Sequence, residues 1–363
     1  MLDFTSALYL DFQHAARDLP NWEQLTLGKP AALEDVPGSA AVERDLATLI
    51  GCQRVSLVTS TLHLFWDLFS LLARDKVRIY LDAGSYPIVR WGVEHAAYLG
   101  ATVHAFPAHD ANVLRQSLIR SRGGPPVIVA DGYCPMCGSH APLEAYLAMV
   151  RPLGGTVVID DSQALGIWGA PAPGASYGSG GGGSMRYMGL SADEPVVMGS
   201  SLGKAFGVPV AMLGGSARLI AEFESRSATR VHCSPPSSVA VLAAARALAL
   251  NRRVGDSLRS RLFRLVKRFR NGLTRLGLSI PTGIFPVQTL QLPSGIEAQH
   301  LHEELRIAGV STVLHRSGFG GEPSLSFVIT AGRTLWDIDE TVSRLACVLT
   351  RIQPKAIQRS YGL

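Results

Sequence analysis

A chain of 363 residues, with 47% hydrophobic and 17% charged residues, can bury a large core, and this balance excludes an intrinsically disordered protein. The net charge of +5 comes mostly from arginines spread along the chain without a nucleic-acid-binding motif, so we expect no nucleic-acid partner. We also expect a cytoplasmic location and no membrane partner, because the sequence shows neither a secretory leader nor a stretch of about 18 apolar residues.

Apolar β-type runs alternate with helical patterns as far as about residue 235. This alternation predicts an α/β fold with a doubly wound, mainly parallel sheet, whose ligands bind at the carboxyl ends of the strands. The predicted strands are Val55–Val58, Val77–Leu81, Thr102–Phe106, Val127–Ala130, Thr156–Ile159 and Val196–Met198. The predicted helices between them include Leu62–Leu72, Pro87–Leu99 and Leu143–Val150.

Beyond that point the pattern changes to longer helices with few strands. The predicted elements are a long amphipathic helix over Ser237–Leu276 with an interruption near Val254-Gly255, strands at Thr289–Leu292 and Leu325–Ile329, and a closing helix over Leu335–Ile352. We therefore expect an N-terminal segment, 1–40, that packs with the small domain, then a large cofactor-binding domain, 41–235, and a small α+β C-terminal domain, 236–363.

Lys204 lies in a loop of small residues, Gly199-Ser200-Ser201-Leu202-Gly203-Lys204, that follows a short apolar run. Such a loop lets backbone N–H groups and hydroxyls approach an anion. A nucleotide-binding P-loop is excluded, because it needs four residues between its glycines and a Ser or Thr after the lysine, whereas Ala205 follows here. Two alternatives remain: an ordinary surface lysine, or a lysine that forms a Schiff base with pyridoxal 5'-phosphate (PLP).

A carboxylate follows the β-branched run Thr156–Ile159, in Asp160-Asp161-Ser162-Gln163. At the carboxyl end of a buried parallel strand, Asp160 can pair with the protonated pyridine nitrogen of PLP. A single aspartate after a strand is more often a helix cap or a metal ligand. Together with Lys204 at the end of another strand, it forms a much more specific signature of PLP.

Further matches, in the same order along the chain, carry a family resemblance. The chain resembles PLP-dependent enzymes of the class I/II aminotransferase fold and, within them, the α-oxoamine synthases, which include 8-amino-7-oxononanoate synthase. The matching segments are Phe4–Leu10 (family F-S-S-N-D-Y-L), Ser60-Thr61-Leu62 (S-G-Y/F), Asp131–Gly138 (E-G-V-F-S-M-D-G), Asp160–Gln163 (D-D-A-H), Ser201–Lys204 (T-x-G-K) and Phe327–Ala331 (L-T-L-T-A). The resemblance implies a fold type I PLP-dependent transferase with a mainly parallel seven-stranded sheet.

The resemblance also implies roles for individual residues. Lys204 is the expected catalytic residue and carries the cofactor, and Asp160 binds the pyridine nitrogen. Gln163 takes the place of a histidine that contacts the ring hydroxyl, and Tyr86 that of a histidine that stacks on the ring. The expected ligands of the phosphate are Ser60, Thr61, Leu62 and Ser201, with Ser234 reaching into the neighbouring subunit of a homodimer.

The positions that face the substrate in the family differ in this chain. Ser326 stands where an arginine binds the amino-acid carboxylate, Ala7 replaces the asparagine that assists it, and Pro135 replaces a serine near the acyl carbonyl. Unless the alignment is locally shifted at Ser326, either another cation binds the carboxylate or the substrate is not a free α-amino acid. The nearest cations in the sequence are His315, Arg316 and Arg333.

Three functional hypotheses follow from these matches. The first is an acyltransferase of the α-oxoamine synthase type, which condenses an acyl thioester, on coenzyme A or a carrier protein, with a small-molecule amine or amino acid. The second is an aminotransferase, which the altered acyl-site residues favour. The third is a PLP-binding protein without catalysis, which the intact pair of Lys204 and Asp160 disfavours.

Two other motifs permit more than one interpretation. Cys134-Pro135-Met136-Cys137 is a C-x-x-C that could be redox-active, half of a zinc site or a plain loop, and we expect no metal. The run Gly178–Ser184 does not meet the dinucleotide-binding pattern, because no predicted strand precedes it, and it predicts a mobile loop near the active site. His63, His104 and His109 are isolated and are expected to be structural histidines.

Overall fold

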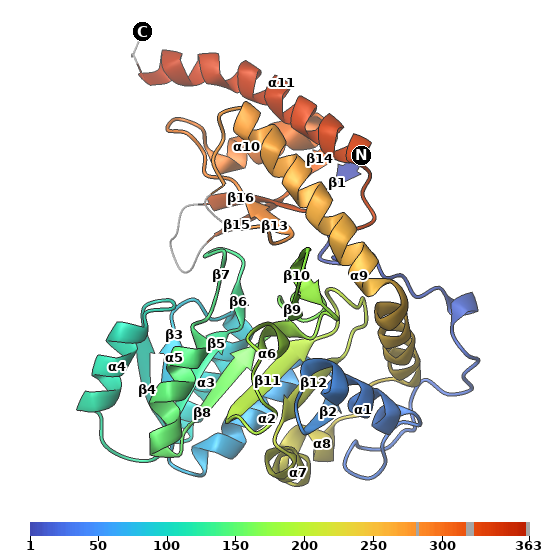
Figure 1. Ribbon diagram of the computed structural model, residues 1–363, viewed down its shortest axis with the longest axis vertical. Helices are drawn as coiled ribbons and strands as arrows, with labels where there is room; N and C mark the ends of the chain where they lie inside the picture. The colour runs from blue at the N-terminus through green and yellow to red at the C-terminus, as the bar shows by residue number, and fades with distance from the viewer. Residues whose placement is uncertain (281–282, 317–322, 361–363) are drawn as a thin grey trace. The chain divides into compact units, whose positions relative to one another are not determined.

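The computed structural model describes residues 1–280, 283–316 and 323–360, with side chains except at residues 316 and 353–360 (Figure 1). The chain divides into two compact units. Unit 1 contains Met1–Asp11, Pro135–Ser139 and Ser257–Leu363, and unit 2 contains Phe12–Cys134 and His140–Asp256. The domain bounds expected from the sequence stay a prediction.

A seven-stranded sheet forms the centre of unit 2, in the order β2-β12-β11-β8-β5-β3-β4. Its strands are β2 (Arg54–Val58), β3 (Arg78–Asp82), β4 (Thr102–Phe106), β5 (Pro126–Asp131), β8 (Thr156–Asp160), β11 (Val196–Ser201) and β12 (Ala211–Gly215). All are parallel except β12, which runs antiparallel to both of its neighbours. The predicted doubly wound, mainly parallel sheet is therefore confirmed.

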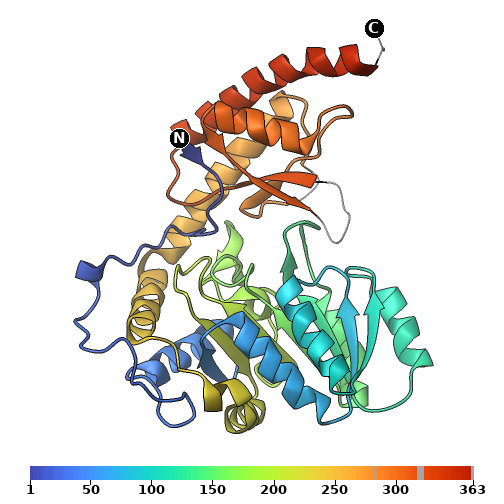
Figure 2. The same cartoon turned by 180° about the vertical axis from the view of Figure 1, so that it is seen from behind.

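Helices cover both faces of this sheet. Because the central strands are therefore buried on both sides, their sequences are continuous apolar runs. Figure 2 shows α2 and α3 side by side on one face, and Figure 1 shows α5 on the other. The helices of unit 2 are α1 (Ser39–Ile50), α2 (Thr61–Ala73), α3 (Pro87–Tyr98), α4 (Ala111–Arg120), α5 (Leu143–Val150), α6 (Gly183–Tyr187), α7 (Ala217–Arg226) and α8 (Ala228–His232), with 3₁₀ turns at Ala16–Asp18 and Arg151–Leu153. Short strands lie at β6 (Tyr133–Cys134), β7 (Ser139–His140), β9 (Ala170–Ala172) and β10 (Ala175–Ser179).

Local sequence signals set where the helices next to the candidate site begin. Ser60 caps α2, and its Oγ accepts the backbone N–H of His63 at 3.4 Å. Pro87 occupies the first turn of α3, where its missing N–H leaves no broken hydrogen bond. These two starts follow directly from the ends of β2 and β3, so they place both helix N-termini at the carboxyl edge of the sheet.

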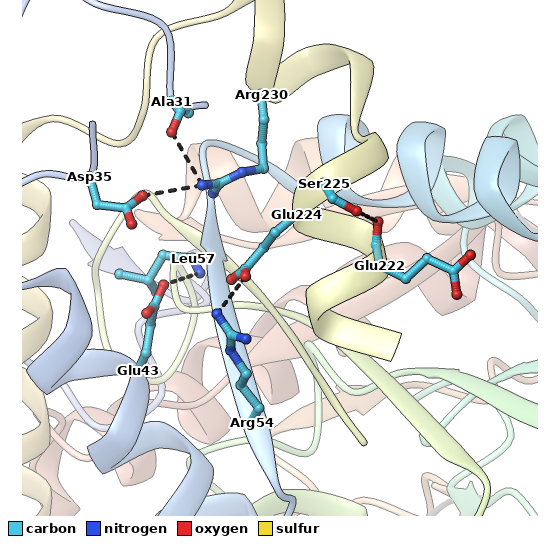
Figure 3. Close-up of polar contacts among 9 residues, drawn as sticks. All are labelled: Ala31, Asp35, Glu43, Arg54, Leu57, Glu222, Glu224, Ser225 and Arg230. Atoms are coloured by element: carbon cyan, nitrogen blue, oxygen red, sulfur yellow. Dashed lines mark hydrogen bonds and ion pairs between the residues drawn. The ribbon is translucent and has the colours of Figure 1, made fainter. Parts of the chain in front are cut away.

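Polar contacts attach the extended segment before α1 to the helices after β12 (Figure 3). Arg230 donates to the carbonyl of Ala31 at 3.2 Å and pairs with Asp35 at 3.3 Å. Glu43 accepts the N–H of Leu57 at 2.9 Å, and its pKa is raised, mainly by burial and partly by nearby acidic groups. This cluster fixes the path of the chain as it enters the first strand of the sheet.

Unit 1 is built around a three-stranded antiparallel sheet in the order β13-β16-β15. An aromatic cluster packs on it, in which the ring of Phe4 lies 5.9 Å from that of Phe327 and 6.5 Å from that of Phe269. The elements are β1 (Leu2–Asp3), β13 (Val287–Thr289), α10 (Ala298–Ile307), β14 (Val310–Ser311), β15 (Val313–Arg316), β16 (Pro323–Val328) and α11 (Leu335–Ser360). β1 pairs in parallel with β14, so the first residues of the chain belong to this unit.

Helix α9 (Ser238–Arg275) is continuous over 38 residues and contributes to both units. The interruption predicted near Val254-Gly255 is wrong. A glycine inside a helix costs only about 1 kcal/mol relative to alanine, and Gly255 lies on the buried face, where packing outweighs that cost. Gly272 lets α9 approach α11 closely, because a Cβ there would come within 2.7 Å of Val342.

No helix within residues 1–280, 283–316 and 323–360 combines the length and the apolar character that a bilayer crossing requires.

Candidate active site

The residues predicted to bind the cofactor follow strands that end at one edge of the central sheet. In the register of the sheet, Asp131 at the end of β5 lies beside Asp160 at the end of β8, and Asp160 lies beside Gly199 of β11. Val58 of β2 and Ser201 of β11 both pair with Ala211 of the strand between them. Asp160 and the loops that carry Ser60 and Lys204 therefore lie at the same edge of the sheet, which is where α/β folds bind ligands.

Lys204 lies in the turn that follows β11. Its Nζ is 5.7 Å from the centroid of the Tyr86 ring. Burial lowers the pKa of Lys204, and the carboxyl groups of Asp160 and Asp131 act in the opposite direction. A lowered pKa increases the fraction of neutral amine, which is the form that attacks an aldehyde.

Hydrogen bonds hold the loops after β8 and β11 together. The backbone N–H of Ser162 donates to Oδ1 of Asp160 at 2.9 Å, and the Ser162 Oγ accepts the N–H of Ser201 at 2.9 Å. The Oγ of Ser201 accepts the N–H of Gly203 at 3.1 Å, one residue before Lys204. Asp160, which is only 5% exposed, is thus connected to the lysine turn by a chain of three hydrogen bonds.

The neighbouring Asp161 has a different environment. It is fully buried and accepts the N–H of Ser184 at 2.9 Å and its hydroxyl at 2.5 Å, while burial raises the pKa of Asp161 to about 6. A Cβ on Gly132 or Gly183 would come within about 2.1 Å of this carboxyl group, so both positions require glycine. Asp161 therefore has a structural role, and the pairing of Asp160 with the pyridine nitrogen stays a prediction.

These contacts overturn the interpretation of the glycine-rich run as a mobile loop. Its first two residues end β10, its last two begin α6, and Gly182 to Ser184 are buried. The composition suggested an open loop because a single sequence does not show that the small residues pack against the buried carboxyl group of Asp161.

Three of the expected phosphate-binding residues, Ser60, Thr61 and Leu62, lie at the N-terminus of α2, whereas Ser201 ends β11. The first backbone N–H groups of a helix lack partners within the helix and point at a bound anion, and here Thr61 and Leu62 provide two of them. Thr59 Oγ1 donates to the carbonyl of Ser234 at 3.0 Å, which brings Ser234 beside the cap residue Ser60. The side chain of Ser234 is exposed, and its predicted contact with a partner subunit stays a prediction.

Tyr86 stands just before α3 and is 52% exposed. Gln163 is half-buried in the loop after β8, two residues beyond Asp161. The expected ring contacts of both residues stay predictions.

The sequence analysis missed Asp131. Its Oδ1 accepts the backbone N–H of Tyr86 at 3.1 Å. Burial, and next the charge of Asp160, hold the pKa of Asp131 well above its ordinary value, which favours the protonated form. The signal that identified Asp160, an aspartate directly after an apolar run, was equally present after Val127–Ala130.

The altered substrate positions belong to unit 1. Ser326 on β16 is 1% exposed, and its Oγ lies 2.7 Å from Oγ1 of Thr289. Nε2 of His315 lies 3.0 Å from Sδ of Met136, and burial lowers the pKa of His315, which disfavours its cationic form. The side chain of Arg316 lies outside the described residues.

The cysteines of the C-x-x-C motif are not joined in a disulfide, and Cys134 is buried whereas Cys137 is exposed. Across the part of the chain that the structure describes, no three His, Cys, Asp or Glu side chains gather as metal ligands would.

A mainly parallel sheet with a half-buried lysine of lowered pKa and an aspartate at its carboxyl edge is typical of fold type I PLP enzymes. The family model of aminotransferase class I and II matches residues 2–345, and the chain belongs to this family. It is 27% identical over 360 residues to 8-amino-7-oxononanoate synthase of Sodalis glossinidius, covering 95% of this chain and 87% of that protein. It is 30% identical over 249 residues to the synthase of Stutzerimonas stutzeri, covering 68% of this chain and 61% of that protein.

Among solved structures, serine palmitoyltransferase of Sphingomonas wittichii has the same fold, with a TM-score of 0.84 at 17% identity over 97% of this chain and 88% of that one. The protein is accordingly a PLP-dependent transferase of the α-oxoamine synthase type. The residues present would suit the cofactor: Lys204 would attach it covalently, Asp160 would face the pyridine nitrogen, and the N-terminus of α2 would bind the phosphate. When bound, PLP supplies an electron sink for negative charge that develops on the substrate carbon.

Proposed function

We propose that this enzyme condenses an acyl thioester, on coenzyme A or a carrier protein, with an amine whose carboxylate is absent or masked as an ester, amide or thioester. Lys204 would remove the proton from the carbon beside the amine, and Asp160 would supply the negative charge opposite the pyridine nitrogen. We expect this chemistry to take place in the cytoplasm.

The buried hydroxyl pair of Ser326 and Thr289 is the observation that supports this substrate class. Ser326 carries no charge, is 1% exposed and contacts Thr289, so it offers a carboxylate neither a cation nor an accessible donor. A buried carboxylate that lacks its charged partner loses roughly 2–5 kcal/mol of binding free energy. Alternatively, the substrate keeps its carboxylate, and His315 or Arg316 binds that carboxylate in place of the missing arginine.

We expect carboxyl-blocked amines to bind better than the matching free amino acids by about 30-fold or more, which corresponds to about 2 kcal/mol. Titrating amino acids, esters and amides against the PLP-loaded enzyme, with the visible absorption of the bound cofactor as the signal, measures this ratio. Ser326→Ala is the matched control, because removing a hydroxyl that does not contact substrate leaves the ratio unchanged. Tight, stereoselective binding of a free amino acid that survives both His315→Ala and Arg316→Ala would contradict the proposal.

An aminotransferase is the second candidate, favoured by Pro135 in place of the serine that is expected near the acyl carbonyl. The products distinguish the two reactions. An acyltransferase releases one thiol for each amine consumed and needs the thioester, whereas an aminotransferase forms an oxo product without it. Thiol release followed with a chromogenic disulfide reagent separates them.

We further propose a two-fold symmetric homodimer, in which Ser234 of each subunit approaches the cofactor phosphate of the other. The side chain of Ser234 is exposed and therefore accessible to a second subunit, which supports this arrangement. Sedimentation velocity of the PLP-loaded protein should give a dimer at micromolar concentration, as expected for an interface of more than about 2,000 Å². An active, fully loaded monomer would contradict the assembly.

A further inference from the structure

His63 makes two contacts with the residue that caps α2. Its Nδ1 lies 2.8 Å from Oγ of Ser60, and its backbone N–H donates to the same Oγ at 3.4 Å. The sequence alone suggested an isolated structural histidine. In the structure its ring is half-buried and lies against the hydroxyl expected to bind the cofactor phosphate.

The hydrogens around this hydroxyl can be counted. A serine hydroxyl has one hydrogen and two lone pairs, and the backbone N–H of His63 occupies one lone pair. If Nδ1 is bare, the Ser60 hydroxyl donates its hydrogen to the ring and has none left for a phosphate oxygen. If Nδ1 carries a hydrogen, it donates to the second lone pair, and the hydroxyl hydrogen is available to another acceptor.

A phosphate at the N-terminus of α2 favours the second arrangement, because the dianion accepts the freed hydroxyl hydrogen in a charge-assisted hydrogen bond. The position agrees with the sheet register, since Ser60 follows the end of β2 at the same edge as Ser201 and Lys204.

We propose that His63 is a positioning residue for the cofactor phosphate: by donating from Nδ1 to Oγ of Ser60, it directs the hydroxyl hydrogen of Ser60 onto a phosphate oxygen. The proposal rests on the phosphate-binding role of Ser60 within the proposed function. It gives His63 no contact with the reacting atoms.

Comparing PLP with pyridoxal, which has the same ring and aldehyde but no phosphate, tests this directly. The full-length chain is freed of cofactor by dialysis, and the binding of each compound is measured by the quenching of tryptophan fluorescence. We expect His63→Ala to weaken PLP binding about tenfold and to leave pyridoxal binding within about twofold of the wild type. His63→Asn, whose amide can donate to Ser60, should recover part of the loss.

A double-mutant cycle separates this proposal from the one on which it rests. Ser60→Ala should lower the preference for PLP over pyridoxal at least as much as His63→Ala, and the double variant should lose no more than Ser60→Ala alone. An unchanged preference in Ser60→Ala overturns the phosphate role of Ser60. A loss in Ser60→Ala without a loss in His63→Ala overturns only the role of His63. An equal loss for PLP and pyridoxal in His63→Ala does the same.

Discussion

Replacing Lys204 with alanine should remove the covalent attachment of the cofactor and lower turnover on the order of 10⁴-fold. Among the described residues of the site, only Lys204 can attack the aldehyde as an amine, and its lowered pKa increases the fraction of the neutral amine. Borohydride reduction of the PLP-loaded protein, followed by peptide mass mapping, should locate the modified residue at position 204 in the wild type and nowhere in the variant.

Lys267→Ala is the matched control for this experiment. Lys267 is an exposed lysine of α9, so its removal should leave both the trapped bond and turnover unchanged. A borohydride-trapped bond at this site that persists in Lys204→Ala would show that another residue carries the cofactor.

Replacing Asp160 with asparagine should preserve cofactor binding and lower turnover on the order of 10³-fold, because it removes the charge that keeps the pyridine nitrogen protonated. The amide oxygen can still accept the N–H of Ser162, so the loop after β8 keeps its hydrogen bond. Steady-state kinetics and the bound-cofactor absorption of the same preparation separate chemistry from binding.

The adjacent Asp161→Asn variant makes the complementary change. Its amide accepts only one of the two Ser184 donors, so thermal unfolding should show a loss of roughly 1–3 kcal/mol of stability, with much less effect on the chemical step. Full turnover by Asp160→Asn would show that another group pairs with the pyridine nitrogen. An equal loss of turnover in both variants would show that Asp161 also contributes to the chemical step and is not only structural.

Most of what the sequence could predict about the sheet and the site came from the predicted strands and the residues at their ends. The β-branched runs of β5, β8 and β11 located both the sheet and the edge from which Asp160 and Lys204 project, because burial on both faces leaves a continuous apolar signal. β12 was not predicted, since Ala211–Gly215 contains no β-branched or aromatic residue. The segment is a strand because β2 and β11 form backbone hydrogen bonds with it on both sides. This pairing in the folded sheet outweighs the weak strand preference of its own residues.

Within the site, the sequence identified groups whose chemistry is apparent from residue type and position, such as Lys204. It could not show which side chain pairs with which. The hydrogen bond from Tyr86 to Asp131 spans 45 residues, and the contact of Ser184 with Asp161 depends on glycines in two separate segments. The pairing of His63 with Ser60 is local, but it depends on where α2 begins, which the sequence placed only approximately.

The buried pair of Ser326 and Thr289 also limits how this enzyme can change during evolution. A single mutation to arginine at position 326 would have to place a guanidinium where Ser326 is 1% exposed and already contacts Thr289, whose hydroxyl in turn lies 3.8 Å from Sδ of Met136. Such an intermediate carries a buried charge and a steric overlap before any gain in carboxylate binding. A single substitution of Ser326 by arginine is therefore expected to destabilise unit 1 before it can create a carboxylate-binding site.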